Sequence, residues 1–100
     1  MYAFTDQAPV NRHRDFCDDI RASSRSAPSN IAEGFGRQTH REFARFLSIA
    51  RGSLGETDNH LQDAFDCRYL TASEFARLSA LARRALVTTT RLQSYLLRTP

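Results

Sequence analysis

The chain has 100 residues and a formal net charge of +3, with 41% apolar and 25% charged residues, which is typical of a single globular domain with one core. No apolar run approaches the roughly 18 residues that a membrane-spanning helix needs, and Met1 is not followed by the basic and apolar segments of a secretory leader. The sequence therefore excludes a membrane-spanning protein and predicts a cytoplasmic one without a membrane partner.

The positive charge is concentrated in the last third of the chain. Residues 1–66 hold eight arginines and ten acids, whereas residues 67–100 hold six arginines and one acid. Every basic residue is an arginine. A GC-rich genome explains this usage through its codons, and partners that carry phosphates or carboxylates explain it through the planar guanidinium group. Composition alone leaves both explanations open.

Residues 1–10 are short of periodic apolar positions and are expected to form an irregular tail, followed by a single helical-bundle domain over residues 11–98. The first helix is predicted over 11–34, with Asn11 as its N-cap. Pro28 removes one backbone donor and predicts a bend within this one continuous helix. The apolar stripe of the helix is formed by Phe16, Ile20, Ala27, Ile31 and Phe35.

A glycine corner separates this helix from the next one. Gly34 is expected to take a positive φ angle that closes the first helix, and Gly36 to keep the corner open. Thr39 lies three residues before Glu42, the spacing of a capping box, which predicts a second helix over about 40–66. Its stripe comprises Phe43, Phe46, Leu47, Ala50, Leu54 and Leu61.

Two features interrupt the middle of the second helix. Gly52 and Gly55 each cost on the order of 1 kcal/mol relative to alanine, which favours a close approach by a neighbouring backbone. A flexible hinge is the weaker interpretation. Thr57 and Asp58 then weaken the stripe, so this turn is expected to pack less well.

The third helix is predicted to open with a capping box formed by Thr71 and Glu74 and to run to about Arg98. Its stripe comprises Phe75, Leu78, Leu81, Ala82, Ala85, Leu86, Leu92, Tyr95 and Leu96. The sequence thus predicts an all-α, antiparallel up-and-down helical bundle with three long helices joined by short corners.

The segments PSNIAEGFGR and EFARFLSIARGSL around the glycine corner resemble the signature of the four helix bundle proteins, also called 23S rRNA intervening-sequence proteins. The matching residues are Pro28, Asn30, Ile31, Ala32, Glu33, Gly34, Gly36, Phe46, Leu47, Ala50, Arg51, Gly52 and Ser53. The resemblance covers roughly residues 14–97. It implies a small bacterial bundle that assembles as a homopentamer, with no assigned enzymatic activity and no cofactor.

Members of this family begin with an additional helix, for which residues 1–10 leave too little chain. Either the reading frame starts too far downstream, or the bundle has a short or missing first helix. In the second case an apolar groove stays uncovered and invites self-association or a partner helix.

No arrangement of chemical groups predicts catalysis or metal binding. His13, His40 and His60 lack the spacing of helical metal ligands, and Cys17 and Cys67 have no C-x-x-C spacing, which favours reduced thiols. The short glycine corner has no preceding strand and is no phosphate loop. The sequence therefore predicts a protein that is not an enzyme and holds no metal or cofactor.

Two rows of arginines are the better candidates for a functional surface. One row recurs every seven residues on the last helix, and the other has i,i+4 spacing at the start of the second helix. Such rows can follow a phosphate backbone, or they can pair with acids of neighbouring helices or subunits. The two rows are Arg77, Arg84, Arg91 and Arg98, and Arg37, Arg41 and Arg45.

The function expected from the residues and the resemblance is a non-enzymatic homo-oligomer, a pentamer by resemblance, whose basic surface contacts RNA or DNA. The alternative is a protein-binding adaptor, similar to the accessory protein of diversity-generating retroelements that docks a reverse transcriptase. An enzyme with a site between subunits is the least favoured. Salt separates the first two, because phosphate contacts weaken steeply with salt and apolar contacts do not.

Overall fold

The computed structural model describes residues 2–7 and 13–99, which form four α-helices and, within these ranges, no strand. The helices are α1 (Tyr2–Thr5), α2 (Arg14–Phe35), α3 (His40–Asp66) and α4 (Ala72–Arg98). The all-α bundle with three long helices and a short first one is confirmed. The bounds predicted for the second and third long helices are confirmed as well. The first long helix was expected over 11–34, but α2 begins at Arg14 with His13 as its N-cap, while the predicted N-cap Asn11 lies outside the described residues.

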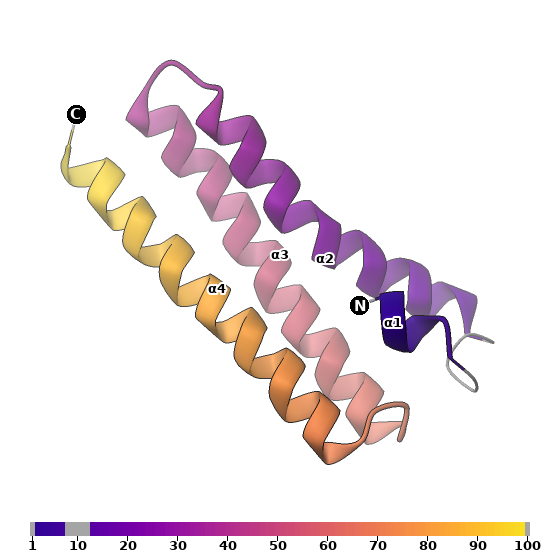
Figure 1. Ribbon diagram of the computed structural model, residues 1–100. Helices are drawn as coiled ribbons and strands as arrows, with labels where there is room; N and C mark the ends of the chain where they lie inside the picture. The colour runs from indigo at the N-terminus through magenta and orange to yellow at the C-terminus, as the bar shows by residue number, and fades with distance from the viewer. Residues whose placement is uncertain (1, 8–12, 100) are drawn as a thin grey trace.

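The three long helices lie side by side in one layer, with α3 in the middle (Figure 1). Among the described helices, α3 packs against both α2 and α4, while α2 and α4 make no comparable contact with each other. The Cα atoms extend over 49 × 22 × 16 Å, so the molecule is elongated along the helix axes. The central helix therefore carries most of the packing.

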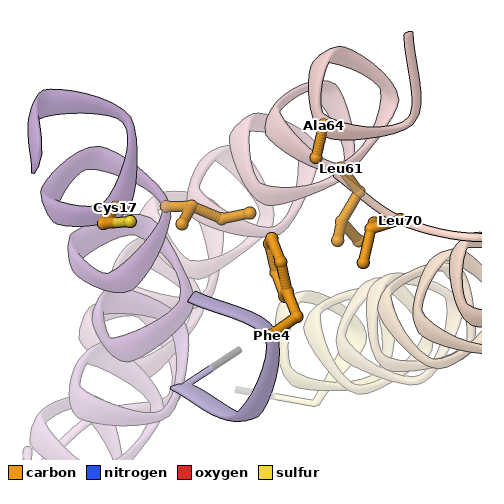
Figure 2. Packing of buried hydrophobic residues seen from close by; sticks show 6 residues of the cluster. Phe4, Cys17, Leu61, Ala64 and Leu70 are labelled. Atoms are coloured by element: carbon orange, nitrogen blue, oxygen red, sulfur yellow. The ribbon is translucent and has the colours of Figure 1, made fainter. Parts of the chain in front are cut away.

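The first residues are more ordered than predicted. Residues 2–5 form one helical turn, and Phe4 is buried in a cluster with Cys17 of α2 and Leu61 of α3. Figure 2 shows the Phe4 side chain pointing from α1 into the space between Cys17 on one side and Leu61 and Leu70 on the other. Burial of one aromatic ring stabilises this turn, although the sequence shows no helical period there.

The glycine corner departs from the prediction at Gly34. The helix continues through Gly34 to Phe35, its C-cap Gly36 has a φ of −77°, and no described glycine has a positive φ. Gly34 is required for space instead, because a Cβ there would lie 2.7 Å from the Cβ of Phe46. The glycine lets α2 and α3 approach closely at the corner.

The capping boxes differ between the two corners. Thr39 Oγ1 accepts a hydrogen bond from the Glu42 N–H (3.1 Å), but the Glu42 carboxylate does not accept the reciprocal bond from the Thr39 N–H. At the second corner both halves form between Thr71 and Glu74. One predicted box is thus confirmed in full and the other only in half.

The end of α3 has a backbone conformation that the sequence does not predict. Arg68 has a φ of 63°, in the left-handed region that normally favours glycine. The Tyr69 N–H donates to the Ala64 carbonyl (2.8 Å) and the Arg68 N–H to the Phe65 carbonyl (3.0 Å). This pair of bonds is the Schellman motif, here closed by an arginine.

The predicted stripes are correct at the centre of the bundle and wrong at its edges. Ile20, Leu47 and Leu61 are fully buried, as predicted, whereas Phe35 is 78% exposed. On α4 the stripe is shifted, because polar residues face α3 while much of the predicted apolar stripe is exposed. The buried residues of α4 are Ser79, Thr89, Gln93 and Leu96, and the exposed members of its stripe include Leu81, Leu92 and Tyr95.

The middle of the bundle is held by hydroxyl groups. Thr57 Oγ1 lies 3.0 Å from Ser23 Oγ, and Ser53 Oγ lies 2.8 Å from Ser26 Oγ, so two hydrogen bonds join α3 to α2. On the other side, Ser79 donates to Asp58 (2.8 Å) and joins α4 to α3. The expectation that the turn around Thr57 packs less well is wrong, because Thr57 is buried and hydrogen-bonded.

The two glycines in the middle of α3 have no close neighbour within the described chain. A Cβ at Gly52 or Gly55 would meet no atom within 4 Å. The close approach expected at these positions is therefore not made by α2 or α4.

Candidate nucleic-acid interface

The first arginine row lies along an exposed edge of α4, because residues seven apart on a helix are nearly two turns apart. All four of its side chains are exposed. Within residues 2–7 and 13–99, Arg84, Arg91 and Arg98 form no ion pair, so their guanidinium groups are available to an anionic partner.

Arg77 differs from the other members because it lies near an acid. The pKa of Glu74 is lowered, first by the hydrogen bonds from Thr71 and then by the charge of Arg77. Apart from Glu74, α4 carries no acid, whereas it carries five arginines. The surface of this helix is therefore strongly basic along its length.

The second row is gathered around an aromatic ring rather than spread over an open helix face. Arg37 pairs with Glu33 (2.8 Å), and its Cζ lies 4.8 Å from the centroid of the Phe46 ring. The Cζ of Arg45 lies 5.3 Å from the same centroid. Phe46 thus holds two guanidinium groups near the α2–α3 corner through cation–π contacts.

The two rows meet at one end of the layer. There the His40 ring nitrogen Nδ1 contacts the Thr99 carbonyl oxygen, which places the start of α3 beside the end of α4. A depression of about 460 Å³ lies at this junction, and its lining includes Arg41 and Leu97. Arg41 and the last arginine of the α4 row, Arg98, therefore belong to the same end of the molecule.

A buried glutamine near this end is a site residue that the sequence analysis missed. Gln93 accepts a hydrogen bond from Arg51 (2.8 Å) and donates to the Ala44 carbonyl (2.9 Å) and to Ser48 Oγ (2.5 Å). It fixes the position of one guanidinium group and the register of α4 on α3. The available signal was a glutamine enclosed between the predicted apolar positions Leu92 and Leu96.

The residues of the family signature lie mainly in contacts between helices. Asn30 donates to the Ser26 carbonyl (2.8 Å), and Ser26 in turn bonds Ser53 across the α2–α3 interface. Leu47 and Ala50 are fully buried. The signature residues nearest the corner are Ile31, Ala32, Glu33, Gly34, Gly36 and Phe46. Pro28 lies within α2, and Arg51 and Gly52 lie in the middle of α3.

The chemically reactive side chains do not converge in the part of the chain that the structure describes. Those residues contain no group of three or more histidine, cysteine or acidic side chains that could hold a metal ion. His60 Nε2 lies 3.7 Å from Glu56, the ring of His13 lies beside Tyr69, and His40 is at the opposite end. None of the described helices is long and apolar enough to cross a membrane.

Comparison with known proteins agrees with the signature in the sequence. A family described as 23S rRNA-intervening sequence protein matches residues 1–89. Neither the curated proteins nor the solved structures contain a match to this chain. Because the family match covers most of the 100 residues, the chain belongs to the family of 23S rRNA-intervening sequence proteins.

Proposed function

We propose that the protein is a non-enzymatic assembly protein that binds the phosphate backbone of RNA or DNA through its arginine surface. The observation that carries this proposal is the exposed arginine row of α4, in which Arg84, Arg91 and Arg98 have no acidic partner among the described residues. Guanidinium groups bind phosphates through charge-assisted hydrogen bonds and release condensed counterions.

The spacing of the row suits an extended anionic polymer better than a small ligand. Successive members are seven residues apart, which corresponds to about 10 Å along the helix axis. A nucleic-acid strand presents several phosphates over the length of the row, so more than one arginine can contact the same strand. No base-specific contact is needed, and binding should depend little on sequence. Because the family name refers to 23S rRNA, RNA is the first probe.

Self-association is the second part of the proposal. The resemblance implies a homopentamer, and the outer face of α3 offers a surface for it. Gly52 and Gly55 each cost on the order of 1 kcal/mol in a helix, although nothing approaches them within the described chain. Ile49 lies on the same helix and is exposed. A second copy that packs closely over these glycines accounts for their presence, and repetition of the basic surface strengthens its field.

The test measures binding of a fluorescein-labelled RNA of about 20 nucleotides by anisotropy, between roughly 50 and 200 mM salt. The R84E/R91E variant should lose binding at every salt concentration. The control R14E/R25E makes the same change in net charge on exposed arginines of α2, outside both rows, and should retain most of the binding. Equal loss in both variants would show that only net charge matters, and unchanged binding by R84E/R91E would overturn the proposed interface.

The subunit number is measured by light scattering on the same samples. A mass of several times 11.4 kDa supports assembly, whereas a monomer that still binds RNA would remove self-association from the proposal and leave the arginine surface.

A protein-binding adaptor is the second candidate function. The observation that favours it is the exposed apolar edge of α4, where Leu81 and Tyr95 have no neighbouring helix to cover them in the described chain. Large apolar side chains that stay exposed along one helix favour an interaction site.

A further inference from the structure

A groove that is open in the described part of the chain lies between α2 and α4. Along α4, Leu81, Leu92 and Tyr95 are between 36% and 53% exposed, although they belong to one apolar edge. A depression of about 390 Å³ lies between the two helices. It is lined by Ile31 of α2 and by Leu81, Arg84, Ala85, Thr88 and Thr89 of α4.

At the opposite end of the helices, α1 occupies the corresponding surface. The single turn of α1 inserts Phe4 between Cys17 of α2 and Leu61 of α3, with Leu78 of α4 packed against the same cluster. A helical segment with an apolar anchor therefore fits this surface. Beyond α1, the stretch of α4 from Leu81 to Tyr95 continues for about 21 Å, which is long enough for roughly four turns of a second helix.

We propose that this groove binds one amphipathic α-helix of a partner protein, with acidic residues along the side that faces α4. Arg84 lines the depression, and Arg77 and Arg91 lie seven residues before and after it on the same edge of α4. The one acid of α4, Glu74, lies before this stretch and is already bonded to Thr71. An incoming helix thus meets an apolar floor and a basic rim, and acids at its flank complement that rim.

A second copy of the chain does not supply such a helix from its described residues. The apolar faces of its α2 and α3 are already packed within the subunit. The α4 helix of a second copy does have an exposed apolar edge. Pairing two such edges would bring the two arginine rows together, and their positive charges would repel each other. Charge therefore favours an acidic partner over self-docking. This inference deepens the adaptor role proposed above and rests on it.

The experiment uses the full chain and labelled helical peptides of about 16 residues, followed by fluorescence anisotropy. The acidic peptide carries leucines at positions i, i+3, i+4 and i+7 with glutamates beside them. One control peptide replaces the glutamates with lysines, and the other has the acidic composition in scrambled order. The acidic peptide should bind at least about tenfold more tightly than either control.

Two matched variants locate the binding surface. Leu81 is 51% exposed and Val87 is 49% exposed, but only Leu81 lines the depression. L81A should therefore weaken binding of the acidic peptide by about tenfold, whereas V87A should change it little. R84E should remove the preference for the acidic over the basic peptide, with circular dichroism confirming that the variants fold.

Each other outcome overturns a defined part of the inference. Equal affinity for the acidic and basic peptides would overturn the acidic partner and leave protein docking in place. Absence of binding by all three peptides would overturn both, while RNA binding would stand on its own measurement. A lower mass for L81E by light scattering would show that a second copy occupies the groove, which also overturns the inference.

Discussion

The backbone of Gly34 lies so close to Phe46 that a Cβ atom at position 34 would sit 2.7 Å from the Cβ of Phe46 and 2.9 Å from Cδ1 of Phe43. Phe46 is also the ring that holds Arg37 and Arg45. One glycine therefore determines both how closely α2 approaches α3 and where two guanidinium groups are placed.

The first prediction concerns this close approach. G34A should lower the free energy of unfolding by about 1–3 kcal/mol, because overpacking outweighs the better helix propensity of alanine. Urea unfolding measures the change. G36A is the control, since its Cβ would meet only the Glu33 carbonyl at an ordinary 3.6 Å. Equal effects of the two substitutions would show that the contact with Phe46 is not decisive.

The second prediction tests the outer face of α3. In an isolated chain, G52Q and G55Q meet open space, and each should stabilise the helix by up to about 1 kcal/mol. In the proposed assembly the added side chains block a neighbouring subunit. We therefore expect the double variant to have a lower mass by light scattering than the parent. An unchanged mass would place the subunit contact elsewhere.

The third prediction concerns the hydroxyl pair between Thr57 and Ser23. T57V should destabilise the fold by about 1 kcal/mol, because the valine cannot bond the Ser23 hydroxyl. The double variant T57V/S23A should lose less than the sum of the two single changes, since both partners are then removed. Unfolding of all four proteins completes the cycle, and strict additivity would argue against a coupled pair.

The fourth prediction follows from the left-handed conformation of Arg68. R68G should raise the stability by roughly 0.5–1 kcal/mol, because glycine adopts a positive φ without steric cost. R68A removes the same charge but keeps a Cβ, so it should not be stabilising. A melting temperature raised equally in both variants would assign the effect to charge rather than to the backbone.

The fifth prediction is a pH dependence at the start of α4. The Thr71 hydrogen bonds and then Arg77 lower the pKa of Glu74 in the folded state. A lowered folded pKa contributes stability above the unfolded value of roughly 4.3, and this contribution is lost as the pH falls through the folded pKa. E74Q should therefore be less stable than the parent at pH 7, and the difference should vanish in acid. A difference that persists at low pH would contradict this origin.

Local signals predicted the helices well, because they depend on residues close in the chain. The capping pair Thr71–Glu74 and the apolar period of α3 define their elements without reference to any neighbour. The burial of Phe4 was not predictable in this way, since it depends on a cluster assembled from α2 and α3.

The side of α4 that faces the core was less predictable. The apolar pattern indicated Leu81 and Tyr95, but the contact with α3 is made by Ser79 and Gln93, whose polar groups find partners across the interface. A hydrophobic pattern marks the positions that gain from burial, and it does not show whether another helix is there to bury them.

The candidate interface was predictable only where it depends on spacing along a single helix. Seven-residue spacing predicts one edge of α4, and its arginines are exposed on that edge. The gathering of Arg37 and Arg45 around Phe46 depends on the path of the corner, and the bond from Arg51 to Gln93 depends on how α4 lies on α3. These contacts depend on how separate helices lie against each other, and the spacing of residues along one helix does not predict them.

The arrangement with α3 between two helices that pack mainly against it, and far less against each other, has a consequence for folding. The hairpins α2–α3 and α3–α4 share one helix, and each can form without the other. Both join neighbours in the chain, which favours rapid closure. Changes in the middle of α3, such as at Thr57, should slow both routes, whereas changes in the outer helices should slow one and leave the other open.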